Sequence, residues 1–249
     1  MLNSTFEQFE VTRIIPLHLF GNLDLSFTNA SLFMIIGVGV YYLLYITNVK
    51  NGLIIPGRWQ SLLEIIYETI SGMVKDNVGS AGNKYIPFIF TLFVWISFMN
   101  IIGIIPYTFT PTAHIIVTMG MSISIYIGCT IIGLINYRSD FFAMFMPAGS
   151  PVVFAPFLVI IEFVSSAAKA ISLGVRLAAN ITAGHLLFAI LAGFTFKMLV
   201  AGGLISVLSI IPMFIVLFIT ILEMAVAIIQ AYVFSLLTTI YINDSEHLH

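Results

Sequence analysis

The chain has 249 residues, of which 60% are hydrophobic and only 8% are charged. Soluble domains carry about 25% charged residues, and so few charges cannot give a protein of this size a polar surface. The composition therefore excludes a soluble protein and predicts an integral membrane protein. The formal net charge of −2 disfavours nucleic acid as a partner. The single cysteine, Cys129, excludes an internal disulfide framework and a cysteine-based metal cluster.

The first half of the chain predicts three spans and one surface helix. Residues 25–49 contain no charge and predict a first transmembrane helix. Residues 57–79 place apolar residues at helical spacing on one face and charged residues on the other, which predicts an amphipathic helix on the membrane surface or on another subunit. The uncharged runs 85–106 and 115–135 predict a transmembrane hairpin.

The distribution of basic residues predicts the orientation in the membrane. Lysine and arginine concentrate in 50–84 and at Arg138, whereas the loop 107–114 has none. Basic residues are enriched on the cytoplasm-like side of membranes, so we expect 50–84 on that side and the N-terminus on the opposite side. Arg13 and Lys197 weaken this bias.

Two later stretches are too long for upright spans. Residues 157–196 contain no proline and three charges, and one helix of this length would measure roughly 60 Å, about twice the hydrocarbon thickness. Residues 198–243 pose the same problem, with Glu223 as the one charge. Each stretch can be a hairpin of two spans or one strongly tilted helix.

The charges of the first long stretch favour one helix. Glu162, Lys169 and Arg176 are seven residues apart and share one helical stripe. Near that stripe, Gly174 is the one turn-forming residue. Because each charge in lipid costs about 2.5–3.5 kcal/mol on insertion scales, the stripe should face protein or water. We expect 157–192 to be mostly one helix, inclined far from the membrane normal.

These elements predict one all-α membrane domain over residues 1–249. It contains a first span (25–49), an amphipathic surface helix (57–79), a transmembrane hairpin (85–135) and two long, strongly tilted helices (151–243). A turn-rich segment with Pro147, Gly149 and Pro151 precedes the first long helix.

Two segments carry a resemblance to a known family. Residues 172–187 (Ser-Leu-Gly-Val-Arg-Leu-Ala-Ala-Asn-Ile-Thr-Ala-Gly-His-Leu-Leu) and 222–234 (Leu-Glu-Met-Ala-Val-Ala-Ile-Ile-Gln-Ala-Tyr-Val-Phe) resemble the signature pair of subunit a of F-type ATP synthase. Residues 100–106 and 147–151 also resemble that family. The resemblance covers about 84–244 strongly and 1–83 only in the order of the segments. The short N-terminal segment, the surface helix after the first span and the charge-poor composition are most similar to the mitochondrial, fungal form.

The resemblance implies a proton-translocating stator subunit of the membrane sector. Two long tilted helices would pack against a rotating ring of c subunits, with one aqueous half-channel open to each side of the membrane. It also implies a role for eight residues: Arg176 against the ring carboxylate, His185 and Glu223 where protons enter, Glu162 with Asp244 on the matrix side, Asn180 and Gln230 near the arginine, and Lys169 in support.

Further expectations follow from the same resemblance. The chain would conduct protons without being catalytic itself, and it would hold no cofactor and no metal. Its partners would be the c ring, other stator and accessory subunits, and membrane lipid. It would span the mitochondrial inner membrane several times, with its N-terminus in the intermembrane space and its C-terminus in the matrix.

The residue types suit this chemistry. A ring carboxylate crosses lipid only when protonated, so it must lose its proton beside a cation. Arginine keeps its charge, whereas a buried lysine can lose it. Histidine has an unperturbed pKa near working pH and suits a relay with a carboxylate. Because His185 lies nine residues after Arg176, about half a turn around the helix, we expect it to face the helix of Glu223.

Ordinary roles stay open for the ionisable residues. His185 can be a hydrogen-bonded core histidine, Glu223 can pair structurally with Lys197 or His185, and Glu162 can be an ordinary interface residue. The other histidines are expected in loops or tails, and no two histidines share an apolar span, which disfavours a haem subunit. The histidines expected in loops or tails are His18, His114, His247 and His249.

Two other functions also stay open. A self-contained transporter or ion channel could bind its substrate at Glu162, Arg176 and Glu223, but no internal repeat links 25–135 to 141–243, as such transporters commonly show. A structural subunit of a respiratory complex would have few intramembrane charges, not clustered on two consecutive helices.

Overall fold

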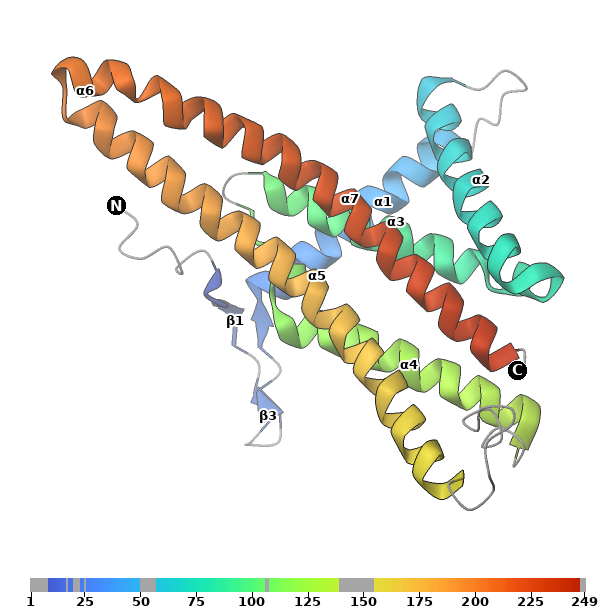
Figure 1. Cartoon of the computed structure of the whole chain (residues 1–249). Helices are drawn as coiled ribbons and strands as arrows, with labels where there is room; N and C mark the ends of the chain where they lie inside the picture. Colours follow the sequence, from blue (N-terminus) through green and yellow to red (C-terminus); the bar gives the residue numbers. More distant parts are fainter. Residues whose placement is uncertain are drawn as a thin grey trace. The chain divides into compact units, whose positions relative to one another are not determined.

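The computed structural model describes residues 9–16, 18–19, 23–24, 26–49, 57–105, 108–138 and 155–246, and these are mostly helical (Figure 1). The chain divides into two compact units. The first comprises Met1–Ile46, Trp95–His114 and Leu177–Ala231, and the second comprises Thr47–Val94, Ile115–Arg176 and Tyr232–His249. The expectations for 147–151, His247 and His249 lie outside the described residues.

The described residues form seven α-helices and two short 3₁₀ helices. The α-helices are α1 (Asn29–Val49), α2 (Arg58–Val78), α3 (Ile86–Ile104), α4 (Ile115–Tyr137), α5 (Ala155–Val200), α6 (Gly203–Leu208) and α7 (Ile210–Glu246). The 3₁₀ helices are η2 (Gly79–Lys84) and η3 (Pro111–Ala113).

Two small antiparallel ladders precede this helical part. β1 (Arg13–Ile15) pairs with β4 (Phe27–Thr28), and β2 (His18–Leu19) pairs with β3 (Leu23–Asp24). His18, which was expected in a loop or tail, thus lies in a two-residue strand of the segment before α1. Strands of two or three residues are too short to show the alternating pattern from which strands are predicted.

The first predicted span is helical from Asn29 onward. The Thr28 amide donates to Ser31 Oγ at 3.0 Å, and the Ser31 amide donates to Thr28 Oγ1 at 3.5 Å. This reciprocal capping serves donors that the first turn leaves open. Further along α1, a Cβ at Gly37 would lie 2.6 Å from Met99 Cε, so the glycine lets α1 approach α3 closely.

The predicted amphipathic helix over 57–79 is α2. Its Ile70 and Val74 side chains are buried, whereas Trp59 is 67% exposed. The helix ends at Gly79, whose φ of 69° lies in the region that glycine adopts readily. Its location on the membrane surface stays a prediction.

Four helical segments in the described part of the chain are long and apolar enough to cross a membrane. They are Ile86–Ile104, Ile115–Tyr137, Phe157–Val200 and Ile205–Glu246. α1 adds 21 residues, which span about 30 Å of helix, the thickness of the hydrocarbon core.

The first long stretch is one helix, as the charge stripe and the missing turn residues predict. α5 has 46 residues without a break, roughly 70 Å at 1.5 Å per residue, and Figure 1 draws it as one ribbon from yellow to orange. The alternative of a hairpin turn at 169–176 is therefore wrong. The inclination of α5 to the membrane normal stays a prediction.

The boundary between the two long helices differs from the prediction. The second long stretch was expected from 198, but α5 continues to Val200. Gly202 and Gly203 then adopt φ angles of 70° and 63°. Positive φ is readily available to glycine, so this pair turns the chain after α5.

Candidate functional site

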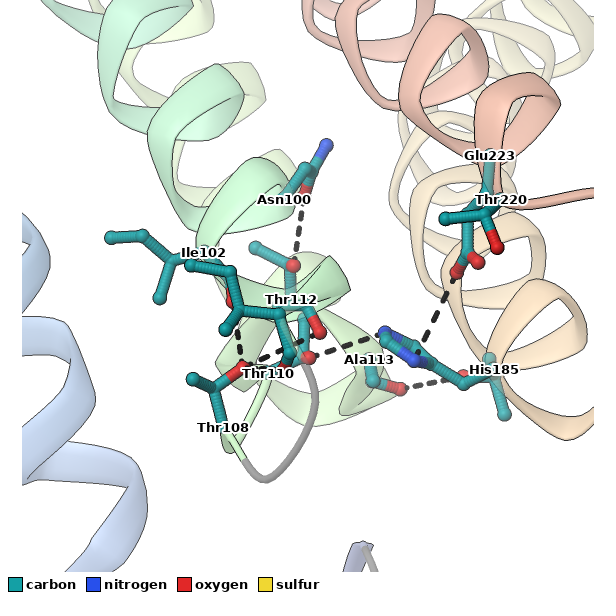
Figure 2. Close-up of polar contacts among 12 residues, drawn as sticks. Asn100, Ile102, Thr108, Thr110, Thr112, Ala113, His185, Thr220 and Glu223 are labelled. Carbon is teal, nitrogen blue, oxygen red and sulfur yellow. Dashed lines mark hydrogen bonds and ion pairs between the residues drawn. The ribbon is translucent and has the colours of Figure 1, made fainter. Parts of the chain in front are cut away.

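The first unit brings together the predicted pair His185 and Glu223. His185 Nδ1, on α5, lies 3.8 Å from Glu223 Oε1, on α7 (Figure 2). The exposed fractions of these two side chains are 14% and 7%. The expectation that His185 faces the helix of Glu223 is confirmed by this contact, whereas the role of the pair in proton transfer stays a prediction.

A glycine next to His185 makes room for the carboxylate. A Cβ built at Gly184 would lie 2.8 Å from Glu223 Oε1 and 3.0 Å from its Cδ. These distances are shorter than ordinary van der Waals contact. The signature motif therefore provides both the imidazole and the space in which its partner lies.

Glu223 is buried and has few polar neighbours of its own. It is 6% exposed, and within the described residues its Oε1 accepts no hydrogen bond. A buried carboxylate is costly when it is charged without a hydrogen-bonded partner. Such a group is suited to taking up and releasing a proton, because neither of its states is fixed by permanent donors.

The loop between α3 and α4 also contacts this pair. Thr110 Oγ1 lies 3.2 Å from His185 Nε2, so the histidine has a polar neighbour at each ring nitrogen (Figure 2). The Phe9 ring meets the imidazole edge-on, with centroids 6.2 Å apart. The sequence-based prediction treated 107–114 as a connection only and missed Thr110.

Hydrogen bonds anchor this loop to α3 and α5, and they tie the same residue of α3 to α7. Thr112 donates to Asn100 Oδ1 on α3 at 2.8 Å, and Asn100 Nδ2 donates to the Ala227 carbonyl on α7 at 3.2 Å. Thr182 on α5 donates to the Ala113 carbonyl at 2.9 Å. Asn100 belongs to the motif 100–106, whose resemblance to the family singled this segment out in the sequence. The motif does not show which distant residues Asn100 contacts.

His114 ends the same loop, as predicted for a loop histidine. Its ring stacks on Phe109 with centroids 5.0 Å apart. Burial lowers the pKa of His114 below the ordinary histidine value. The neutral imidazole is therefore favoured at this position.

In the second unit, α5 packs on α4 through small residues. A Cβ at Gly174 would lie 3.0 Å from Met119 Cα, so the two backbones nearly touch there. Ser122 donates to the Ala170 carbonyl, and the hydroxyls of Tyr126 and Ser166 are 2.8 Å apart.

The charged stripe of α5 is exposed on the surface of this chain. Glu162, Lys169 and Arg176 are all exposed. Arg176 follows Gly174 by two residues, which is about 200° around a helix, so it lies on another face of α5 than the glycine that packs on α4. The expectation that these charges avoid acyl chains stays a prediction.

The remaining predicted residues lie on the two long helices. Asn180 on α5 is exposed, whereas Gln230 and Asp244 on α7 are half-buried. Asn180 and Gln230 belong to the first unit, and Asp244 belongs to the second. Their roles beside the arginine and on the matrix side stay predictions.

Glu246 has a cluster of partners that the sequence did not reveal. Its Oε1 lies 2.8 Å from Lys84 Nζ, and it accepts hydrogen bonds from Tyr85 Oη and, at 3.3 Å, from Asn136 Nδ2. The Tyr137 hydroxyl donates to the backbone carbonyl of Glu246. These contacts tie the end of α7 to the end of η2 and to the last turn of α4.

The cluster changes the acid–base properties of two groups outside the spans. The hydrogen bond to Glu246 raises the pKa of the Lys84 ammonium above its ordinary value. Burial, followed by the hydrogen bond to Glu246, raises the pKa of Tyr85. Both groups therefore keep their protons, and their hydrogen bonds to Glu246, throughout the neutral range.

Comparison with known proteins gives matches along nearly the whole chain. Residues 30–243 match the family model of the ATP synthase A chain. The chain is 51% identical to ATP synthase subunit a of Metridium senile over 244 residues, 98% of each chain. Identity is 46% to subunit a of Chondrus crispus over 251 residues, covering 100% of this chain and 98% of the relative. It is 42% to subunit a of Rhodospirillum rubrum over 248 residues, covering both chains completely.

Proposed function

This chain belongs to the ATP synthase A chain family, and we propose on that premise how its own residues carry protons. It is the proton-translocating subunit of the membrane sector, a multi-pass membrane protein that works with the c ring and the other subunits of the complex. The other two functions that the sequence left open, a self-contained transporter and a respiratory structural subunit, do not agree with this membership.

The pair His185 and Glu223 forms the relay where protons enter from one side of the membrane. The observation that carries this proposal is the 3.8 Å approach of the two side chains between apolar helices. An imidazole can accept and donate a proton near neutral pH. A carboxylate at this distance can exchange that proton after a small movement or through one water molecule.

Arg176 is the fixed cation beside which the ring carboxylate loses its proton. Its exposed position, on another face of α5 than the glycine that packs on α4, supports this role, because a ring helix can reach it there. Asn180 and Gln230 hold the carboxylate or the guanidinium by hydrogen bonds. The permanent charge also keeps a proton from passing directly between the two half-channels.

Glu162 and Asp244 form the second half-channel, through which protons leave on the matrix side, and Lys169 supports them. Glu162 lies near the start of α5 and Asp244 lies near the end of α7. Carboxylates beside water are suited to releasing protons.

The chain itself catalyses no bond formation, so ATP is made elsewhere in the complex. Each elementary charge that moves down the potential supplies about 2.3 kcal/mol per 100 mV. The chain lies in the mitochondrial inner membrane, with its N-terminus in the intermembrane space and its C-terminus in the matrix. Its other partners are accessory subunits, membrane lipid and the transported protons. The fungal form of the subunit is part of this proposal.

The proposal is tested by Glu223→Gln and His185→Ala in the assembled complex. Each variant should slow proton-driven ATP synthesis in membrane vesicles by at least about tenfold, because general acid–base groups contribute typically 10²–10⁴-fold. Assembly should be unchanged, as measured by co-purification with the ring. Normal synthesis rates in both variants would show that the pair is structural.

A further inference from the structure

We propose that Thr110 is a positioning residue of the proton path: its hydroxyl holds the His185 imidazole so that Nδ1 faces Glu223. This inference rests on the proposed relay function of the pair and adds a third residue to it, from a loop outside both signature motifs. Two observations support it, the contacts of the imidazole and the hydrogen bonds that anchor the loop. The chemistry of a hydroxyl agrees with both.

The geometry places the imidazole between two polar groups. Thr110 Oγ1 lies 3.2 Å from Nε2, and Glu223 Oε1 lies 3.8 Å from Nδ1 (Figure 2). The two ring nitrogens of a histidine are distinct, because the hydrogen bond at one sets the role of the other. A partner at Nε2 therefore fixes both the rotation of the ring and the nitrogen that exchanges protons with Glu223.

A hydroxyl is suited to a histidine that changes its protonation state. It can donate its hydrogen to a bare Nε2 and can accept from a protonated one after a simple rotation. A carboxylate would favour the charged imidazole, and an ammonium would favour the neutral one. A threonine favours neither strongly, so the histidine can pass through both states in each turnover without losing its orientation.

The loop that carries the Thr110 hydroxyl is hydrogen-bonded close to both His185 and Glu223, directly to α5 and, through Asn100 on α3, to α7. Thr182, which anchors Ala113, lies three residues before His185 on α5, and Ala227, which anchors Asn100, lies four residues after Glu223 on α7. Each anchor is thus about one helical turn from a member of the pair.

Tight packing on α3 restricts Thr110 further. Thr110 is 6% exposed. A Cβ at Gly103 would lie 2.3 Å from Thr110 Oγ1 and 2.4 Å from its Cγ2. The side chain of Thr110 therefore lies directly against the backbone of α3, and the hydroxyl has little freedom to move away from His185.

Thr108 provides a matched control in the same loop. Its hydroxyl donates to the carbonyls of Ile102 and Ile105 at 2.6 and 2.7 Å, which are backbone atoms of the loop and of the end of α3. Replacing it by valine removes a hydroxyl from the same loop without removing a neighbour of His185.

The experiment compares Thr110→Val, Thr110→Ser and Thr108→Val in the assembled complex in membrane vesicles. Thr110→Val, which keeps the shape and removes the hydroxyl, should slow proton-driven ATP synthesis about two- to tenfold, the range of one net hydrogen bond. Thr110→Ser should restore a rate near that of the wild type, and Thr108→Val should also remain near it. All three complexes should retain the ring on purification.

Three results would overturn the proposal. They are a normal rate for Thr110→Val, an equally slow Thr110→Ser, and an equal loss for Thr108→Val, which would make the effect one of loop packing. His185→Ala, measured in parallel, separates the two proposals. A normal rate there overturns the relay itself, whereas a slow His185→Ala with a normal Thr110→Val overturns only the role of Thr110.

Discussion

Glu223 and Glu246 lie on the same helix, α7, but in different chemical surroundings. Glu223 is 6% exposed, and its carboxylate lies 3.8 Å from the imidazole of His185. Glu246 is held by Lys84 at 2.8 Å and accepts hydrogen bonds from Tyr85 and Asn136. Among the described residues, Glu223 has one titratable partner, at 3.8 Å, whereas Glu246 has several close donors.

The difference shows how one helix can carry both an exchangeable proton and a fixed anchor. Hydrogen bonds from several donors stabilise one charge state of a carboxylate, so Glu246 is suited to hold the end of α7 in place. A carboxylate with one neighbour near 4 Å is held less firmly in either state. Glu223 is therefore the acid that we expect to exchange protons.

The largest expected effect concerns Arg176, the permanent cation of the proposed mechanism. Arg176→Ala should lower proton-driven ATP synthesis below about 1% of the wild-type rate, because leaving a buried carboxylate without its cation costs about 3–5 kcal/mol. Arg176→Lys should fail as well, since a lysine that becomes buried against the ring can lose its proton. The measurement is synthesis in vesicles that contain the assembled variant complex, together with passive proton leak.

This prediction also separates charge from packing. The side chain of Arg176 is exposed on this chain, so the variant should still assemble. Near-normal coupled synthesis by Arg176→Ala would contradict the proposed mechanism, because Glu223 and His185 alone would then suffice.

The next effect concerns the space beside Glu223. Gly184→Ala would place a Cβ 2.8 Å from Glu223 Oε1, and the flexible carboxylate would have to leave the position in which it faces His185. The rate of a reaction falls steeply when the reacting groups are misplaced, so we expect ATP synthesis to slow by about tenfold while the complex remains assembled. Proton-driven synthesis per assembled complex is the measurement.

Gly193→Ala on the same helix is the matched control, because a Cβ there meets nothing within 4 Å in the described part of the chain. Its rate should stay near that of the wild type. Equal rates for the two alanine variants would mean that the distance between His185 and Glu223 does not limit proton transfer.

The smallest expected effect on the rate of ATP synthesis concerns Glu246, which holds the end of α7 in place. Glu246→Gln keeps an acceptor but removes the charge, so we expect the assembled complex to lose about 1 kcal/mol of stability while synthesis stays near the wild-type rate. Thermal inactivation of the purified complex measures the loss.

Glu64→Gln on α2 is its control, because Glu64 accepts a hydrogen bond from Gln60 in an exposed position, where such contacts contribute little. If Glu246→Gln slowed synthesis as much as Glu223→Gln, the contrast between the two acids would be wrong.

The sequence by itself determined the features that depend on local periodicity. The absence of charge predicted the spans, the seven-residue spacing of Glu162, Lys169 and Arg176 predicted one helix where α5 lies, and the offset of His185 from Arg176 predicted which helix the imidazole faces. Each of these follows from residues within one helix, whose geometry is fixed by the backbone.

The tertiary structure alone decided which distant side chains meet. Thr110 contacts His185 across 75 positions of sequence, and Tyr85 contacts Glu246 across 161. The approach of Gly184 to Glu223 and the pairing of the short strands before α1 belong to the same class. No periodic pattern encodes such contacts, because they arise when separate segments pack and fill the space between them.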